Sequence, residues 1–326
     1  MITAPPSFPL AQPRRLMLVV NKHMPGITIY DADTQQSVGS ASMGIYPHEA
    51  AFSADGQYAY VPIYGSSGVG KPGTDEHTLH FLRASDCQII ESLDTEQYKR
   101  PHSIVVGGQS GLIYMTAEIA EAVIIVDPKQ RRIVGTIPTG SNTSHMVAVT
   151  RDEGKAYVSN VRSKTISVLD LKSRTLMDAI ETEGENQRMT LSPDERWFVT
   201  NLGPAKKIAF YRSSDHQLDF TVPVEGTPFV SKFSADGKFL YTAGFAGEGR
   251  NAAWKIGVEQ RKATATLSDG LGGDVGSLEV NPFNKAVYVS DQATDTIYEI
   301  DPETWEITKT LSTAKSPDAM AFAIVR

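Results

Sequence analysis

Three histidines stand at the same point of three consecutive repeats: His48 in PHEAAF, His102 in PHSIVV and His145 in SHMVAV. Neutral imidazoles are common ligands of transition metals, and three of them with an open fourth position describe a catalytic metal site. Gln187 takes the equivalent place in the next repeat and could complete the shell. These residues predict a divalent metal ion that polarises an oxygen or activates water. They do not distinguish Mn, Zn, Fe or Cu, and no nucleotide or organic cofactor is indicated.

Common ancestry of the repeats is an alternative explanation of the three histidines. The remaining repeats place Phe229, Gly276 and Asp318 at the same point. In this interpretation each imidazole hydrogen-bonds a neighbouring loop and supports the channel wall, as buried polar groups must. Both interpretations stay open at the level of the sequence.

Further residues with acid, base or anion-binding chemistry fall in loops close to the histidines. Arg100 and Arg188 could bind a carboxylate, and Tyr98 or Glu118 could act as general base or acid. These four residues are the predicted catalytic groups.

An insertion at 65–80, GSSGVGKPGTDEHTLH, lengthens one loop by roughly ten residues relative to the other repeats. Its glycines predict a mobile lid, and a solvated surface loop is the alternative. Its GxxGxGK string lacks the spacing and the following helix of a phosphate-binding loop. The residues predicted to bind substrate or to form the lid are His23, Tyr64, His77 and Asn142.

Short strands must position all of these groups, because three segment types recur in fixed order. An apolar strand enters a tight turn, as in HEAAFSADG; a second strand follows, as in KAYVSN; and an alternating third strand follows, as in ISVLD. A weaker fourth strand completes each unit. Alternation over five residues indicates strands, and four antiparallel strands every 40 to 50 residues or so match a propeller blade.

The segments KAYVSN at 155–160 and WFVTN at 197–201 resemble the YVTN-type repeat of seven-bladed β-propellers, a family with YncE-like and lactonase-like members. The resemblance implies an all-β propeller with four antiparallel strands per blade. It implies functional residues on one face, here called the top face, where the loops entering each first strand and joining second to third strands surround the channel mouth. Activity does not follow from it, because one fold hosts many functions.

Counting blades predicts how the ring closes. The N-terminal LMLVVN, GITIYD and SVGSAS lack a preceding first strand, and the C-terminal SPDAMAFAIVR lacks following strands. Pairing these ends completes the first blade and removes an open sheet edge. A single domain is therefore expected over 1–326, with an extended arm at about 1–14. The expected blades are 15–42 with 315–326, then 43–94, 95–137, 138–180, 181–224, 225–269 and 270–314.

Composition narrows the classes of partner. The net charge is −7 and no Lys/Arg run offsets it, which argues against nucleic-acid and anionic-membrane binding. Cys87 is the one cysteine, so no intrachain disulfide forms. No apolar stretch reaches the roughly 18 residues of a spanning helix. A cytoplasmic protein is expected, or a periplasmic or secreted one if a leader has been removed; the oligomeric state is unknown.

Three functions are compatible with these features. The first is a small-molecule enzyme at the channel mouth, metal-assisted through the histidines, with lyase, hydrolase or isomerase chemistry on a polar or anionic substrate. The second is a propeller that binds a ligand or protein without chemistry. The third, for which no motif is found, is a lactonase-like hydrolase.

Overall fold

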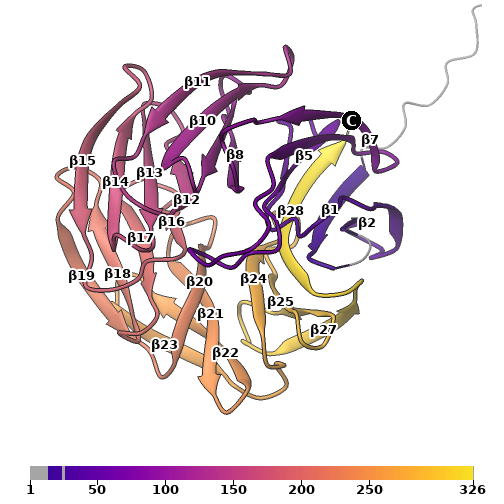
Figure 1. Cartoon of the computed structure of the whole chain (residues 1–326). Coiled ribbons are helices and arrows are strands. Elements are labelled where there is room, and N and C mark those ends of the chain that lie inside the picture. The colour runs from indigo at the N-terminus through magenta and orange to yellow at the C-terminus, as the bar shows by residue number, and fades with distance from the viewer. Residues whose placement is uncertain (1–13, 24–25, 326) are drawn as a thin grey trace, which may run out of the picture.

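Seven four-stranded antiparallel sheets form a ring in the computed structural model, which describes residues 14–23 and 26–325 (Figure 1). No helix occurs among these described residues. The predicted seven-bladed, all-β propeller is confirmed. The predicted N-terminal arm lies almost entirely outside the described residues.

The four strands of every blade follow one another from the inner strand to the outer strand. Blade one contains β28 (Pro317–Val325), β1 (Arg14–Asn21), β2 (Ile27–Asp31) and β3 (Ser37–Ala41). Blade two contains β4 (Ala51–Phe52), β5 (Tyr58–Ile63), β6 (Thr78–Arg83) and β7 (Gln88–Asp94). Blade three contains β8 (Pro101–Val106), β9 (Ile113–Ala117), β10 (Ala122–Asp127) and β11 (Arg132–Pro138). Blade four contains β12 (Ser144–Val149), β13 (Lys155–Asn160), β14 (Thr165–Asp170) and β15 (Thr175–Glu181).

The second half of the ring repeats this order. Blade five contains β16 (Met189–Leu191), β17 (Trp197–Leu202), β18 (Lys207–Arg212) and β19 (Leu218–Pro223). Blade six contains β20 (Thr227–Phe233), β21 (Phe239–Gly247), β22 (Arg250–Gly257) and β23 (Lys262–Leu267). Blade seven contains β24 (Val275–Val280), β25 (Val287–Asp291), β26 (Thr296–Ile300) and β27 (Ile307–Ser312).

The core lies between blades. In β13 every residue after Lys155 is buried, because a neighbouring blade covers each face of the sheet. In the outer strand β15 most residues are exposed, and one edge of that strand pairs with β14. Continuous apolar runs therefore mark second and third strands, and polar sequences mark the fourth.

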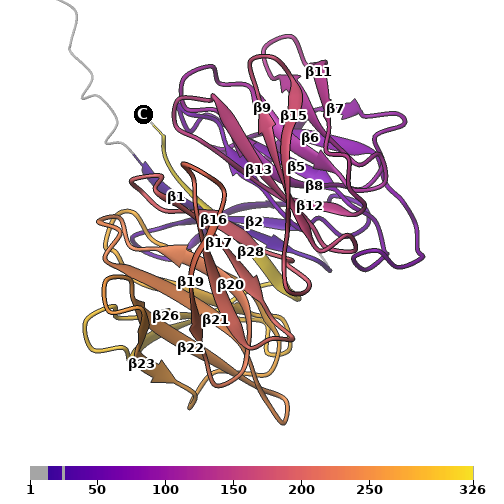
Figure 2. The same ribbon diagram turned by 90° about the vertical axis from the view of Figure 1, so that its left-hand side faces the viewer.

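The ends of the chain meet in blade one. β28 pairs antiparallel with β1, with Leu16 opposite Ala323 and Leu18 opposite Ala321. The two strands lie side by side in both views (Figures 1 and 2). The predicted closure of the first blade by the C-terminal strand is confirmed.

Hydroxyl groups of the repeated second-strand motif tie successive blades together. Thr116, in LIYMTA, donates to the carbonyl of His145 at 2.8 Å, and Ser290, in AVYVSD, donates to the carbonyl of Asp318 at 2.9 Å. A buried carbonyl left without a partner would be costly, so the Thr or Ser of the motif fixes where the next blade's first strand begins.

Candidate functional site

The three ring histidines lie together at the channel mouth. The ring centroids of His48 and His102 are 5.3 Å apart, and those of His102 and His145 are 3.8 Å apart. Two local features aim these side chains inward. His102 and His145 sit where the register of their strands shifts against the second strand, and such bulges redirect side chains.

The second feature is a left-handed residue two positions before each of these ring residues. The residues at this position are Tyr46, Arg100, Thr143 and Ser316, with φ between 46° and 63°. This conformation is uncommon for residues other than glycine and costs on the order of 1 kcal/mol. It turns the chain abruptly from the top loop into the first strand, so the fourth ring residue, Asp318, also reaches the mouth.

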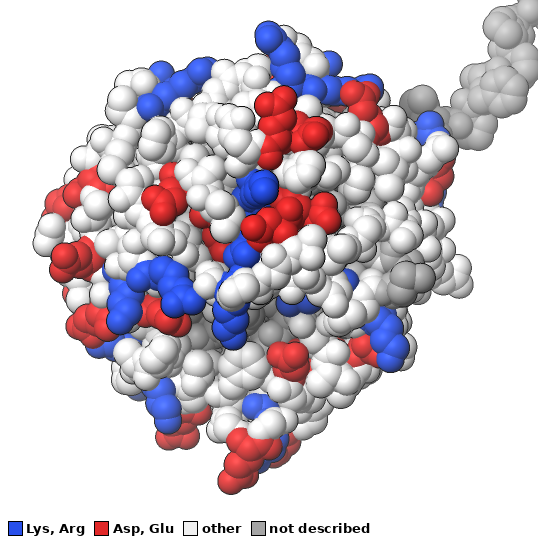
Figure 3. Space-filling view, viewed as in Figure 1, with Lys and Arg blue, Asp and Glu red and all other residues white. Residues whose placement is uncertain are grey.

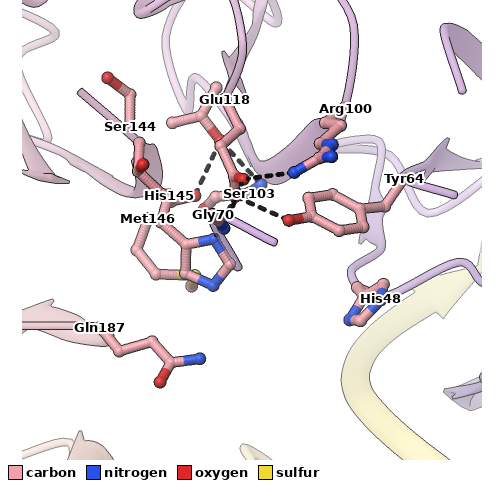
Figure 4. Close-up of polar contacts among 12 residues, drawn as sticks. His48, Tyr64, Gly70, Arg100, Ser103, Glu118, Ser144, His145, Met146 and Gln187 are labelled. Carbon is pink, nitrogen blue, oxygen red and sulfur yellow. Dashed lines mark hydrogen bonds and ion pairs between the residues drawn. The ribbon is translucent and has the colours of Figure 1, made fainter. Parts of the chain in front are cut away.

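The geometry gives the predicted metal site no support. The rings of His102 and His145 lie face to face with a 33° tilt, so their edges do not converge on a common centre. Gln187 contributes its backbone carbonyl to a hydrogen bond from Ser159, and its side chain lies apart from the polar network in Figure 4. Within residues 14–23 and 26–325, no group of three or more His, Cys, Asp or Glu side chains is arranged to hold a metal ion.

Glu118 is the centre of the polar network at the mouth (Figure 4). It follows β9, and its side chain is 1% exposed. One carboxylate oxygen accepts hydrogen bonds from the Tyr64 hydroxyl at 2.8 Å and from His145 Nδ1 at 3.2 Å. The other accepts from the Gly70 N–H at 3.1 Å and from Arg100 at 3.2 Å.

These contacts shift the pKa values of Glu118 and Tyr64. Burial alone would raise the pKa of Glu118, but the hydrogen bonds and charge of His145 and the bond from Gly70 outweigh it, so the pKa is lowered. An ionised carboxylate only accepts, so His145 donates to it from Nδ1. Burial, together with the Glu118 charge, raises the pKa of Tyr64, which therefore stays a donor.

His102 lies between the other two imidazoles and is 1% exposed. Its Nδ1 atom has no hydrogen-bond partner among the described residues. Burial, and then the charges of His145, His48, Arg188 and Lys22, hold its pKa well below the ordinary value. His102 is therefore neutral, and it offers one unsatisfied ring nitrogen inside the site.

A second group of charges lies opposite Glu118, around Asp318. Its Oδ2 atom is 3.1 Å from Lys22 Nζ and 3.2 Å from His48 Nδ1. Arg188 reaches it from blade five at 3.6 Å and also contacts Glu49 at 2.7 Å. Burial would raise the pKa of Asp318, but Lys22, His48 and Arg188 together lower it. Glu118 and Asp318 are thus fixed carboxylates on opposite sides of the imidazoles.

The predicted lid folds over this site. Residues 65–77 cross the centre of the ring from the end of β5 toward β16 (Figure 1). The carbonyl of Gly70 accepts a hydrogen bond from Arg162 of blade four at 2.7 Å. Arg100 of blade three donates to the carbonyl of Lys71 at 2.8 Å and pairs with Asp75 at 2.5 Å. The lid is therefore held to two blades other than its own, and a cleft of about 520 Å³ remains between it, Glu118 and Asn142.

Several predicted site residues lie elsewhere. The Tyr98 hydroxyl accepts a hydrogen bond from Thr136 and its ring packs in a blade interface, so it supports a loop. His77 is 41% exposed and pairs with Asp94. His23 is exposed and contacts the Tyr46 ring edge. Arg100 and Arg188, expected to clamp a ligand, are both paired with carboxylates of this chain.

Three residues of the site were not among the predicted ones: Asp318, Lys22 and Glu49. Asp318 had a signal in the sequence, because it stands at the ring position of the histidines and is ionisable. Lys22 and Glu49 follow a strand and a ring residue respectively, and nothing in their local sequence distinguishes them from surface charges.

The face in Figure 3 carries acidic and basic side chains interspersed, without a large area of one sign. Residues 14–23 and 26–325 contain no helix that is long and apolar enough to cross a membrane.

Comparison with known sequences confirms the resemblance to YncE-like propellers. Residues 103–243 match the family described as YNCE-like beta-propeller.

Two 6-phosphogluconolactonases are similar over part of the chain. That of Cronobacter sakazakii is 24% identical over 140 residues, 41% of this chain and 41% of the relative. That of an Enterobacter species is 27% identical over 141 residues, 41% of this chain and 42% of the relative. The similarity thus spans about two fifths of each of these relatives.

Solved structures share the architecture over most of the chain. The periplasmic gluconolactonase of Pseudomonas aeruginosa has a TM-score of 0.75 at 15% identity, covering 96% of this chain and 100% of that one. The hydrazine synthase of Kuenenia stuttgartiensis has a TM-score of 0.70 at 14% identity, covering 83% and 87%. At these identities the similarity shows the fold alone.

Proposed function

We propose that the channel mouth hydrolyses the cyclic ester of a small lactone, with His145 as general base. The observation that carries the proposal is the buried pair of Glu118 and His145, in which the carboxylate lies 3.2 Å from Nδ1 and so directs Nε2 away from itself. Carboxylate and imidazole pairs of this kind activate water or hydroxyl nucleophiles in hydrolases. The names of the two partly matching 6-phosphogluconolactonases favour a lactone over other esters.

In the proposed reaction, Nε2 of His145 takes a proton from a water molecule as the water oxygen adds to the lactone carbonyl carbon. The ring C–O bond then breaks, and the imidazolium returns the proton to the departing alkoxide, giving the open hydroxy acid. Glu118 stays ionised throughout and stabilises the imidazolium that forms between these steps.

Three further side chains would assist this reaction. His102 has an unsatisfied, buried ring nitrogen that would hydrogen-bond a polar atom of the substrate. Lys22 and Arg188 lie close enough to lower the pKa of His102, and they would favour negative charge on the attacked carbonyl oxygen or on a substrate anion. Their pairing with Asp318 and Glu49 keeps them in place before substrate arrives.

Substrate access would require movement of the lid, because His102 and His145 are each 1% exposed beneath it. The cleft beside Glu118 and Asn142 is the natural entrance. Closure would exclude water beyond the one that reacts.

Hydrolysis of glucono-δ-lactone and of 6-phosphoglucono-δ-lactone, followed as acid release in a pH-stat, tests the proposal. The wild type should exceed the spontaneous rate with at least one of them, and His145→Ala should lower kcat/KM by roughly 10²-fold or more. The matched control is His216→Ala on the opposite face, where the imidazole pairs with Asp178. Equal activity of the two variants, or no activity above buffer, would contradict the proposal.

Treatment with EDTA separates this mechanism from the metal-assisted one predicted from the sequence. Activity that survives EDTA supports His145 acting on water directly. Activity that is lost with EDTA and restored by Mn²⁺ or Zn²⁺ would show instead that a metal ion activates the water.

A further inference from the structure

The face opposite the lid, here called the bottom face, carries the hairpins that join each first strand to its second strand. In two of the grooves between blades, a glutamate from one hairpin enters the hairpin of the preceding blade. Glu153 of blade four accepts hydrogen bonds from the N–H groups of Gln109 and Ser110 at 2.7 and 2.9 Å, and from the Tyr114 hydroxyl at 2.9 Å. Glu195 of blade five accepts from the Arg151 N–H at 2.6 Å.

These glutamates are the left-handed residues of their hairpins, with φ of 51° and 58°. In blades two and six as well, the left-handed residue of this hairpin faces the preceding blade. At Gly56 of blade two, an added Cβ would lie 2.4 Å from the Ile324 carbonyl oxygen. At Gly237 of blade six it would lie 3.6 Å from the Pro193 side chain.

Blade three departs from this pattern. Its left-handed hairpin residue is Gly111, with φ of 70°, and a Cβ added there would meet no atom within 4 Å. The neighbouring hairpin residues, Gln109 and Ser110, carry no carboxylate either. The groove between blades two and three is consequently open, and it forms a cavity of about 550 Å³.

The walls of this cavity repeat the groups that bind glutamate in the filled grooves. The same hydrogen bond closes each of these hairpins, so it can be used to align them. It runs from Ser53 N–H to the Tyr58 carbonyl in blade two and from Thr150 N–H to the Lys155 carbonyl in blade four. By this match Ala54 corresponds to Arg151, whose N–H binds Glu195. The same bond in blade three, from Gly107 to Leu112, matches Tyr60 to Tyr114.

The remaining walls of the cavity suit the apolar part of a small ligand. Tyr58, Phe81, Ile90 and Val106 line the cavity, and Lys129 and Arg131 stand at its rim, with Arg131 paired to Glu91. The volume lies within the range of small-molecule sites, roughly 300 to 1,000 Å³. Asp55 also lines the cavity, but its carboxylate is bound by its own turn through Ser53 and Gln57.

An acidic residue at the position of Asp55 does not prevent a carboxylate from entering the groove. Asp152 holds the same place in blade four, bound by Thr150 and Gly154 of its own turn, and Glu195 still enters that groove. Burial raises the pKa of Tyr60 to about 12, so its hydroxyl remains a donor at neutral pH.

We infer that the groove between blades two and three binds a small organic carboxylate with an apolar body, whose carboxylate takes the place that Glu153 and Glu195 take in the neighbouring grooves. The main-chain N–H of Ala54 and the Tyr60 hydroxyl hold the carboxylate, and Tyr58 and Phe81 hold the body. This site is separate from the channel mouth and does not depend on the proposed hydrolase activity.

Titration with 3-phenylpropionate, followed by the backbone amide signals of the protein, tests the inference. The Ala54 amide should shift saturably, and the neutral 3-phenylpropanamide should bind roughly tenfold more weakly, because hydrogen bonds to an ionised acceptor are the stronger ones. Tyr60→Phe should weaken binding several-fold. Tyr114→Phe, the same change in the filled groove, should leave it unchanged. Equal affinities for acid and amide, or shifts confined to the channel mouth, would overturn the inference.

Gly111→Glu and Gly111→Gln supply a second test that needs no ligand. Both place a side chain at the left-handed residue, and they differ only in charge. By the hydrogen-bond match Gly111 stands one residue after the place of Glu153, but it lines the open groove, so a glutamate there should still enter it. At pH 7 the glutamate variant should have a Tm a few degrees above that of the glutamine variant and should not bind 3-phenylpropionate. Equal Tm values together with undiminished binding to the glutamate variant would overturn the inference. If either variant fails to fold, the Tyr60→Phe result decides.

Discussion

His145 Nδ1 lies 3.2 Å from Glu118 Oε2, and the two side chains are 2% and 1% exposed. They come from different blades, since Glu118 follows β9 in blade three and His145 lies in β12 of blade four. The packing of the two blades therefore sets their separation. Thr116, two residues before Glu118, reinforces this separation because its hydroxyl donates to the His145 carbonyl.

Replacing Glu118 with glutamine should lower kcat for lactone hydrolysis by roughly 10² to 10⁴-fold. The amide can still accept a hydrogen bond from His145, but it cannot stabilise an imidazolium with a full negative charge. Initial rates at saturating substrate measure the effect. Glu96→Gln, on an exposed top-face loop, is the control and should retain wild-type rates. Equal rates for both variants would remove Glu118 from the mechanism.

Acidification should destabilise the fold through His102. Its pKa is lowered in the folded state, so below an unfolded pKa of about 6.5 the unfolded chain takes up a proton that the folded one refuses, and stability falls with falling pH. One such proton contributes up to about 1.4 kcal/mol per pH unit. His102→Gln should reduce the slope of unfolding free energy against pH between pH 6 and 5, measured by urea denaturation. The slopes of variant and wild type should coincide above pH 7; an unchanged slope at pH 5 to 6 would contradict the prediction.

Removing Arg162 should loosen the lid without altering the blades. Arg162→Ala deletes the hydrogen bond to the Gly70 carbonyl, a contact worth about 1 kcal/mol, so hydrogen exchange within 65–77 should be roughly fivefold faster. Arg174→Ala deletes a comparable bond to the Val134 carbonyl on the outer strands and should leave lid exchange unchanged. Faster exchange throughout the ring would point instead to general destabilisation.

Deleting residues 317–326 should prevent formation of a stable monomer. The deletion removes β28, uncovers Leu16, Met17 and Leu18 of β1, and leaves an unpaired strand edge. Size-exclusion chromatography and thermal unfolding measure the outcome. Deleting only 325–326 spares almost all of the pairing and serves as control. A monomeric ten-residue truncation with near wild-type Tm would contradict the closure described here.

The architecture was predictable because every blade repeats the same pattern of strands and turns. Segments such as KAYVSN and ISVLD have a period of two and lie between turn signals, and burial on both faces demands that pattern. Closure followed from counting strands at the two ends. The long loop was predictable as well, since an insertion at 65–80 interrupts an otherwise regular spacing; its action as a mobile lid stays a prediction.

The site was less predictable, because its geometry depends on contacts between blades. Alignment brought His48, His102 and His145 together but gave no ring orientation, and ligands can be distinguished from stacked rings only by orientation. Arg100 and Arg188 were expected to be free for a ligand, yet their partners Asp75 and Glu49 lie in other blades. Tyr98 faces a blade interface, which its position in a top loop did not reveal.

The pairing of β28 with β1 also bears on how the protein is made. On the ribosome β1 emerges before every other described strand, and its partner β28 emerges after all of them. Blades two to seven can fold in order during synthesis, but the buried side chains of β1 must wait until translation has passed the last strand. A nascent chain with this strand order exposes an apolar edge for most of its synthesis, and molecular chaperones recognise such an edge.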